Sequence, residues 1–270
     1  MYALRTLWLG TALIAAANLL GCSSAKETST PITSADTTAV TAPTEPTTPA
    51  AAVFVPTEES DAVLSRVSQL PTQDRLPAGR WQAGRNYDVL VPAQPTNAAP
   101  GKVEVVEVFW YGCSHCYELE PFIDSWKKNK PANIELVRLP VTWNAPARLH
   151  ARLYYTLLAL KREDLHTRVF DSVFRKNNPL IGRDEASTLE LQVEWAKENG
   201  IDAASYTDAF NSMWVSTKLR QADELVQRYR VEGTPYVIVN GKYTTDVAKA
   251  GGQRELVALI NDLAAAETRR

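Results

Sequence analysis

Cysteine, histidine and methionine are scarce in this chain of 270 residues, which has three cysteines, three histidines and two methionines. So few cysteines exclude the dense disulfide framework of a small secreted scaffold. Charge of one sign is also missing, because 29 Lys and Arg residues face 31 Asp and Glu residues, for a net charge of −2. The basic residues form no stripe with interleaved aromatics, so we expect no nucleic-acid partner.

A long hydrophobic run is lacking too. Residues 7–21 are mostly apolar, but about 15 residues are fewer than the ~20 that a membrane-spanning helix needs. Arg5 precedes this run, as in export signals, and the run ends in 19–22 (LLGC), which resembles the bacterial lipoprotein box. We therefore expect residues 1–21 to be a lipoprotein signal peptide and Cys22 to be lipidated. An ordinary secretory signal with an incidental cysteine is the alternative.

Residues 22–75 are predicted to form a flexible tether. Up to about residue 56 the segment consists mainly of Thr, Ala, Pro and Ser, and such a composition cannot bury enough apolar surface to offset its ordering entropy. A flexible chain of ~35 residues spans roughly 30–35 Å. Residues 61–70 are predicted to form a short helix within this segment.

Two stretches rich in β-branched and aromatic residues, 102–111 and 133–139, predict buried strands. An edge strand is expected at 81–91, a hairpin at 236–245, and helices at 116–128, 147–161, 164–176, 188–199, 203–213, 215–230 and 255–266. This order predicts one α/β domain in two parts, 76–140 and 226–270, which is interrupted by a helical insertion at 141–225.

Two of the three cysteines lie two residues apart in 109–117 (FWYGCSHCY). Cys113 is expected at a helix N-terminus, where free N–H groups lower the pKa of a thiol and so favour the nucleophilic thiolate. Cys116, one turn later, is expected to be more buried and to attack a mixed disulfide formed at Cys113. His115 supplies a hydrogen-bond donor, and a cation when protonated, that stabilises the Cys113 thiolate. A stabilised thiolate favours the reduced form and makes the disulfide a strong oxidant.

A metal site and a structural disulfide are the alternatives for the cysteine pair. A structural zinc site needs four ligands, whereas Cys113, His115 and Cys116 supply at most three. A purely structural disulfide would close a loop too small to remove much chain entropy. We therefore expect a redox pair with no metal and no cofactor. His150 and His166 fall in predicted helices and are interpreted as ordinary helix-surface residues.

A second motif lies at 231–236 (VEGTPY), where a proline enters a predicted strand. Such a proline cannot donate to the sheet, and a cis proline is typical of tight, specialised turns; a simple loop-ending proline is the alternative. Together with a CxxC pair between a strand and a helix, this arrangement resembles the thioredoxin fold. Residues 109–121 (FWYGCSHCYELEP) and 239–243 (VNGKY) narrow the resemblance to the DsbA family of thiol:disulfide interchange proteins, over about 76–266.

The resemblance implies an α/β thioredoxin fold with an inserted all-helical domain, and a periplasmic disulfide oxidase anchored to a bacterial membrane as a lipoprotein. It makes Cys113 the nucleophile, Cys116 the resolving cysteine, His115 the activating histidine and Pro235 the cis-proline. Glu107 falls where the family has a buried acid that assists proton transfer from the second cysteine. An outward-facing strand residue is the alternative for Glu107.

The resemblance also implies partners. These are reduced, unfolded exported proteins, a membrane quinone-linked thiol oxidase similar to DsbB as reoxidant, and the membrane through the lipid anchor; the protein itself is expected to be a monomer. Apolar surface at Trp110, Tyr236 and Trp143 is predicted to hold the substrate chain, with Thr234 beside it.

Two residues depart from the best-known family members. Ser114 stands where those members have proline, and Thr234 stands where they have valine. Both positions belong to the redox centre, so a disulfide reductase or isomerase of the same fold remains open as a second hypothesis. A redox-inactive chaperone with the same fold is a third.

Overall fold

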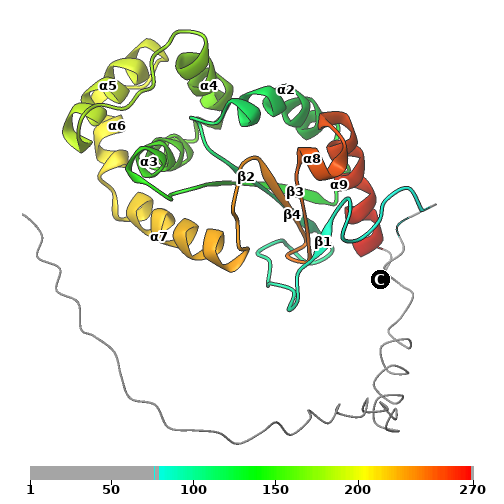
Figure 1. The fold of residues 1–270 in the computed structure, drawn as a ribbon. Helices are drawn as coiled ribbons and strands as arrows, with labels where there is room; N and C mark the ends of the chain where they lie inside the picture. Colours follow the sequence, from blue (N-terminus) through cyan, green and yellow to red (C-terminus); the bar gives the residue numbers. More distant parts are fainter. Residues whose placement is uncertain (1–75, 77–78, 269–270) are drawn as a thin grey trace, which may run out of the picture. The chain divides into compact units, whose positions relative to one another are not determined.

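The computed structural model describes residue 76 and residues 79–268 (Figure 1). The predicted signal peptide, Cys22, the tether at 22–75 and the short helix at 61–70 lie outside the described residues. Within the described part of the chain, no helix is long and apolar enough to cross a membrane.

A five-stranded mixed sheet lies at the centre of the domain, in the order β1-β5-β4-β2-β3. Its strands are β1 (Asp88–Val89), β2 (Val103–Phe109), β3 (Ile134–Pro140), β4 (Tyr236–Val239) and β5 (Tyr243–Thr245). The β2 strand pairs in parallel with β3 and antiparallel with β4. The β5 strand pairs antiparallel with both β4 and β1. Every residue of β2 is buried, as expected for a β-branched strand covered on both faces.

Helices cover both faces of this sheet (Figure 1). On one face, Val103 and Val105 pack in a core with residues of α2 (Ser114–Asn129) and α9 (Gln253–Thr268). On the other face, Val106 and Val108 share a core with residues of α3 (Ala145–Ala159) and α7 (Met213–Arg228). The alternation follows from the two-residue period of a strand. The one-turn helix α8 (Val247–Ala250) precedes α9.

The helical insertion lies between β3 and β4 in the chain. Besides α3 and α7 it contains the 3-10 turn η3 (Glu163–Leu165), α4 (His166–Phe174), α5 (Glu185–Glu198) and α6 (Ala203–Phe210). Helix α6 ends earlier than predicted because the Ser212 side chain accepts the Val215 N–H and so caps α7. Helix α7 continues to Arg228, beyond the expected end of the insertion at residue 225.

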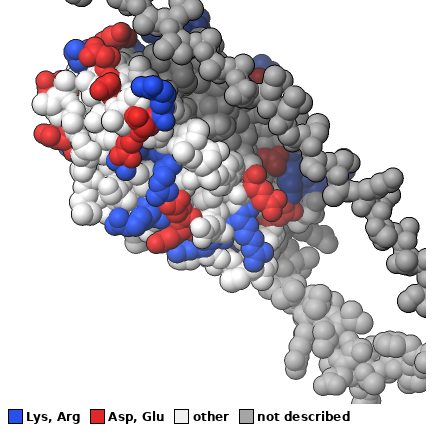
Figure 2. All heavy atoms as spheres, turned by 60° about the vertical axis from the view of Figure 1, so that its left-hand side comes forward, with Lys and Arg blue, Asp and Glu red and all other residues white. Residues whose placement is uncertain are grey.

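Acidic and basic side chains are interspersed on the face of the molecule in Figure 2, which brings the left-hand side of Figure 1 forward. On the described part of this face the basic residues form no continuous surface. This distribution agrees with the balanced charge of the sequence.

Candidate active site

The two neighbouring cysteines lie where the chain passes from β2 into α2. Cys113 is the N-cap residue of α2, and Cys116 lies in its first turn. Both are free thiols; Cys113 is half-buried and Cys116 is 1 % exposed. The Cys113 N–H donates to the Trp110 carbonyl at 3.0 Å, which closes the turn between strand and helix. The Cys113 sulfur therefore lies at the helix N-terminus, as the sequence predicts.

The surroundings of Cys113 favour its thiolate. They lower its pKa to about 5, chiefly through a hydrogen bond from the Cys116 thiol, although partial burial opposes this shift. The Thr234 side chain and the backbone N–H groups of Cys116 and His115 lower the pKa further. Cys116 behaves in the opposite way, because burial and the neighbouring Cys113 sulfur raise its pKa far above the usual range. The pair thus combines a nucleophilic thiolate with a buried thiol.

We expect the thiolate of the reduced protein to titrate with a midpoint near pH 5, the pKa of Cys113, whereas a free cysteine titrates near ~8.5. Because this pKa is lower in the folded than in the unfolded chain, the thiolate stabilises the reduced protein fully above the unfolded pKa. That stabilisation is lost as the pH falls through about 5. The ultraviolet absorbance of the thiolate measures the midpoint, and Cys113→Ser should remove the transition. A wild-type midpoint near that of free cysteine would contradict the prediction.

A loop from the other half of the fold lies beside the reactive cysteine. The Thr234–Pro235 peptide bond is cis, and the Thr234 carbonyl oxygen is 3.3 Å from the Cys113 sulfur. Pro235 is buried, whereas Thr234 and Tyr236 are half-buried. The antiparallel pairing of β4 with β2, which sets Tyr236 opposite Val108, holds the loop in this place.

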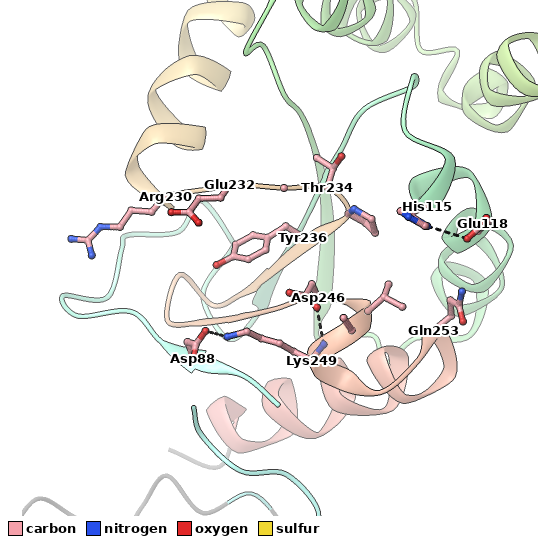
Figure 3. Close-up of a pocket in the computed structure, with 14 residues that line it drawn as sticks. Asp88, His115, Glu118, Arg230, Glu232, Thr234, Tyr236, Asp246, Lys249 and Gln253 are labelled. Atoms are coloured by element: carbon pink, nitrogen blue, oxygen red, sulfur yellow. Dashed lines mark hydrogen bonds and ion pairs between the residues drawn. The ribbon is translucent and has the colours of Figure 1, made fainter. Parts of the chain in front are cut away.

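The His115 side chain lies on the exposed surface of α2 and contacts Glu118. Its side chain is 75 % exposed, and its Nδ1 lies 3.3 Å from a carboxylate oxygen of Glu118 (Figure 3). The backbone N–H of His115 contributes to the low pKa of Cys113. Both side chains border the cavity next to the cis-proline loop.

Glu107 is buried, with a relative exposure of 2 %, so it is not the outward-facing residue of the alternative interpretation. The strand register places it opposite Arg138 on β3, whose Nε donates to Glu107 Oε2 at 3.0 Å. The same guanidinium donates to both carboxylate oxygens of Glu120 on α2, at 3.0 and 3.1 Å. Burial raises the pKa of both glutamates, and Arg138 opposes that shift. Arg138 therefore hydrogen-bonds to two buried carboxylates, one on β2 and one on α2, the helix that carries Cys116.

The interpretation of His166 as a surface residue is wrong, because its exposure is only 3 %. Its Nδ1 is 2.7 Å from the Tyr111 hydroxyl, two residues before Cys113, and its Nε2 is 3.4 Å from Glu120. Burial lowers the pKa of His166 well below its usual range, so the ring is neutral, and a hydrogen bond joins its Nδ1 to the Tyr111 hydroxyl. His166 thereby links the helical insertion to the turn that carries the cysteines.

His150 is buried as well, with 2 % exposure, so its interpretation as a helix-surface residue is also wrong. Its Nε2–H donates to the Pro179 carbonyl at 2.8 Å, and burial lowers its pKa to about 4. The ring lies near Trp110, with centroids 6.3 Å apart. Trp110 is half-buried beside the dithiol turn, while Trp143 is 46 % exposed.

Arg138, Glu120 and His166 were missed as site residues. A signal for two of them existed in the sequence, because Glu120 follows the buried Cys116 by four residues, and His166 precedes Phe170 by four. Residues four apart share one face of a helix, so both lie on buried faces. Within the described residues, no group of three or more His, Cys, Asp and Glu side chains is placed to hold a metal ion.

Proteins of the thioredoxin fold that keep one cysteine as a thiolate and its neighbour as a buried thiol exchange disulfides with other thiols. The described domain falls in this class of thiol:disulfide oxidoreductases. Comparison with known families gives a match to the DSBA-like thioredoxin domain over residues 135–258.

Curated relatives and solved structures agree with that match. The chain is 34% identical over 187 residues to the thiol:disulfide interchange protein DsbA of Pseudomonas aeruginosa, an alignment that covers 69% of this chain and 85% of the relative. The DsbA of Burkholderia cepacia is 36% identical over 62% of this chain and 76% of its own. The crystal structure of the Pseudomonas aeruginosa protein has a TM-score of 0.66 at 34% identity, covering 71% of this chain and 97% of that structure. This chain belongs to the DsbA family of thiol:disulfide interchange proteins.

Proposed function

We propose that this protein introduces disulfide bonds into exported proteins by transferring a Cys113–Cys116 disulfide. The observation that carries the proposal is the contrast between the two thiols, with a pKa of about 5 at Cys113 and a strongly raised pKa at Cys116. A stabilised thiolate stabilises the reduced pair. The disulfide is therefore a strong oxidant and is readily transferred to substrate thiols.

The reaction proceeds in two exchanges. A substrate thiolate attacks the Cys113 sulfur, the Cys113–Cys116 bond breaks, and Cys116 leaves with the bonding electrons and takes up a proton. A second substrate thiolate then attacks the substrate sulfur of the mixed disulfide, and Cys113 leaves as a thiolate. Two electrons pass from the substrate to the protein. Of the two protons that the substrate loses, one goes to Cys116 and the other to solvent.

Glu107 is proposed as the acid that moves a proton to and from Cys116. Burial raises the pKa of its carboxyl group, and a raised pKa keeps a carboxylic acid able to donate near neutral pH. Arg138 opposes the rise and so keeps the group from being locked in its protonated form. Glu107 lies on β2, six residues before Cys113, which is also the position of the buried acid in the family.

The substrate chain is proposed to lie against the cis-proline loop. Thr234 and Tyr236 line a cavity of about 580 Å³ beside this loop, and Trp110 packs half-buried next to the dithiol turn. Trp143 is 46 % exposed and is proposed to offer further apolar surface to an unfolded segment.

The place of action proposed for the protein is the periplasm, where disulfides persist. The resemblance of 19–22 to a lipoprotein box supports a lipid anchor at Cys22, and the Thr-, Ala- and Pro-rich composition up to about residue 56 supports a tether from that anchor. We propose that a membrane quinone-linked thiol oxidase similar to DsbB reoxidises the pair, and that the protein acts as a monomer.

The reduction potential separates an oxidase from a reductase. We expect equilibrium with glutathione to give a potential closer to about −120 mV, the value of a strong disulfide oxidant, than to about −270 mV, the value of thioredoxin. The low pKa of Cys113 is the physical reason. A value near that of thioredoxin would overturn the oxidase and favour the reductase or isomerase hypothesis that Ser114 and Thr234 leave open.

A further inference from the structure

The cavity beside the cis-proline loop is bordered chiefly by three parts of the fold, together with Asp88 of β1 and Arg230, which follows α7 (Figure 3). The loop itself contributes residues 232–236, the first turns of α2 contribute His115 and Glu118, and the chain from β5 into α9 contributes residues 246–249 and Gln253. Because Thr234 also touches the Cys113 sulfur, a chain bound in this cavity would lie next to the reacting atom.

Negative charge prevails around this cavity. Its charged lining consists of four carboxylates and two cations, namely Asp88, Glu118, Glu232, Asp246, Arg230 and Lys249. The balance is −2 when His115 is neutral. This excess decides little by itself, because ion pairs within the lining could cancel it locally.

The two cations do not offset the acidic side chains evenly. Lys249 Nζ donates to Asp88 Oδ2, and the Lys249 backbone N–H donates to Asp246 Oδ1 at 2.7 Å. Lys249 therefore pairs with Asp88 and Asp246 at one end of the cavity. Arg230 is exposed, and its side chain extends away from the other labelled residues (Figure 3).

Glu118 and Glu232 remain without a Lys or Arg partner among the described residues. Glu118 is 58 % exposed and contacts only the His115 ring, and Glu232 is exposed at the start of the cis-proline loop. They border the cavity from α2 and from the loop, on opposite sides of Thr234 (Figure 3). Basic side chains of a segment bound in the cavity would thus find one carboxylate on each side of Thr234.

We propose that this cavity makes the disulfide exchange selective for substrate segments that carry Lys or Arg near the reacting cysteine. Glu118 and Glu232 are the specificity-determining residues, and the preference rests on the proposed function of the Cys113–Cys116 pair. Exposed carboxylates without a Lys or Arg partner attract basic segments and raise their rate of encounter. The Pro235, Tyr236 and Val247 side chains in the same lining offer apolar surface to the aliphatic stems of Lys and Arg.

The test uses two short peptides that differ only in having Lys or Glu on both sides of one cysteine. The oxidised full-length protein is mixed with each peptide, and the rate of reduction of the Cys113–Cys116 disulfide is measured. Each rate is divided by that of the same peptide with uncharged 2,2′-dithiodipyridine, because neighbouring charges also change the thiolate fraction of the peptide. We expect the corrected rate to be about threefold to tenfold higher for the Lys peptide. The difference should shrink at high salt.

Variants assign the preference to the two glutamates. Glu118→Gln with Glu232→Gln should bring the ratio of the two corrected rates close to one. The ratio compares two peptides on the same protein, so a general loss of activity does not change it. Glu198→Gln, which removes an exposed carboxylate on α5, should leave the ratio as in the wild type.

Equal corrected rates in the wild type, or an unchanged ratio in the double variant, would overturn the proposal while leaving the oxidase intact. If neither peptide reduced the disulfide, although both reacted with 2,2′-dithiodipyridine, the proposed function itself would be overturned.

Discussion

The Cys113→Ser protein is expected to restore no activity to reduced, unfolded ribonuclease beyond the background of spontaneous oxidation. A serine hydroxyl forms no disulfide, so the protein holds no oxidising equivalent to transfer. Cys116 cannot take over the role, because it is 1 % exposed and burial raises its pKa far above the usual range. The recovery of ribonuclease activity in a glutathione-free buffer measures the effect.

Two further serine variants make this result specific. Cys116→Ser also lacks the disulfide, but its Cys113 thiolate persists and should accumulate as a stable mixed disulfide with an activated substrate. Cys22→Ser removes the remaining cysteine of the chain and should retain full oxidising activity in solution. Restoration of ribonuclease by Cys113→Ser would sink the proposed mechanism and favour a redox-inactive chaperone.

The elements that hold the dithiol could be predicted because their signals are local. The run of β-branched residues in 102–111 identifies β2, the CxxC pair follows it directly, and the Asn-Gly turn at 240–241 marks the β4–β5 hairpin. The proximity of Pro235 to Cys113, which are far apart in the sequence, could be predicted only from the family resemblance. In the structure the Thr234 carbonyl touches the Cys113 sulfur, so two segments with independent local signals meet at the reactive atom.

The ionic network beneath the dithiol could not be predicted, because it depends on strand register and on burial. Arg138 meets Glu107 only because β2 and β3 pair in parallel with these two residues opposite each other, and nothing in either strand specifies that alignment. The prediction that His150 and His166 lie on helix surfaces was wrong for a different reason. His150 shares a helix face with Ala147, Ala151 and Tyr154, all of them buried, so helical spacing contained the information and the polarity of the side chain obscured it.

Replacing Arg138 with methionine is expected to lower the free energy of unfolding by about 3–5 kcal/mol, the usual cost of breaking a buried ion pair by removing one partner. Glu107 and Glu120 would lose the guanidinium that hydrogen-bonds to both of them, and their side chains are only 2 and 3 % exposed. Urea unfolding at neutral pH measures the loss. Arg148→Met is the matched control, because its ion pair with Asp223 is 46 and 34 % exposed and should contribute about 0–1 kcal/mol.

The pH dependence of this loss identifies its cause. Burial raises the pKa of Glu107 and Glu120 above the unfolded value, and removing Arg138 takes away the largest effect that opposes this rise. A carboxyl group with a raised pKa contributes stability below its unfolded pKa and loses that contribution as the pH rises through the folded pKa. The deficit of Arg138→Met should therefore be smaller near pH 4 than near pH 8, whereas lost packing would cost the same at both. Glu107→Gln and Glu120→Gln added to Arg138→Met should recover part of the stability at the higher pH, since they remove the buried charges themselves. A deficit independent of pH would show that Arg138 acts through its packing and that its charge has little effect.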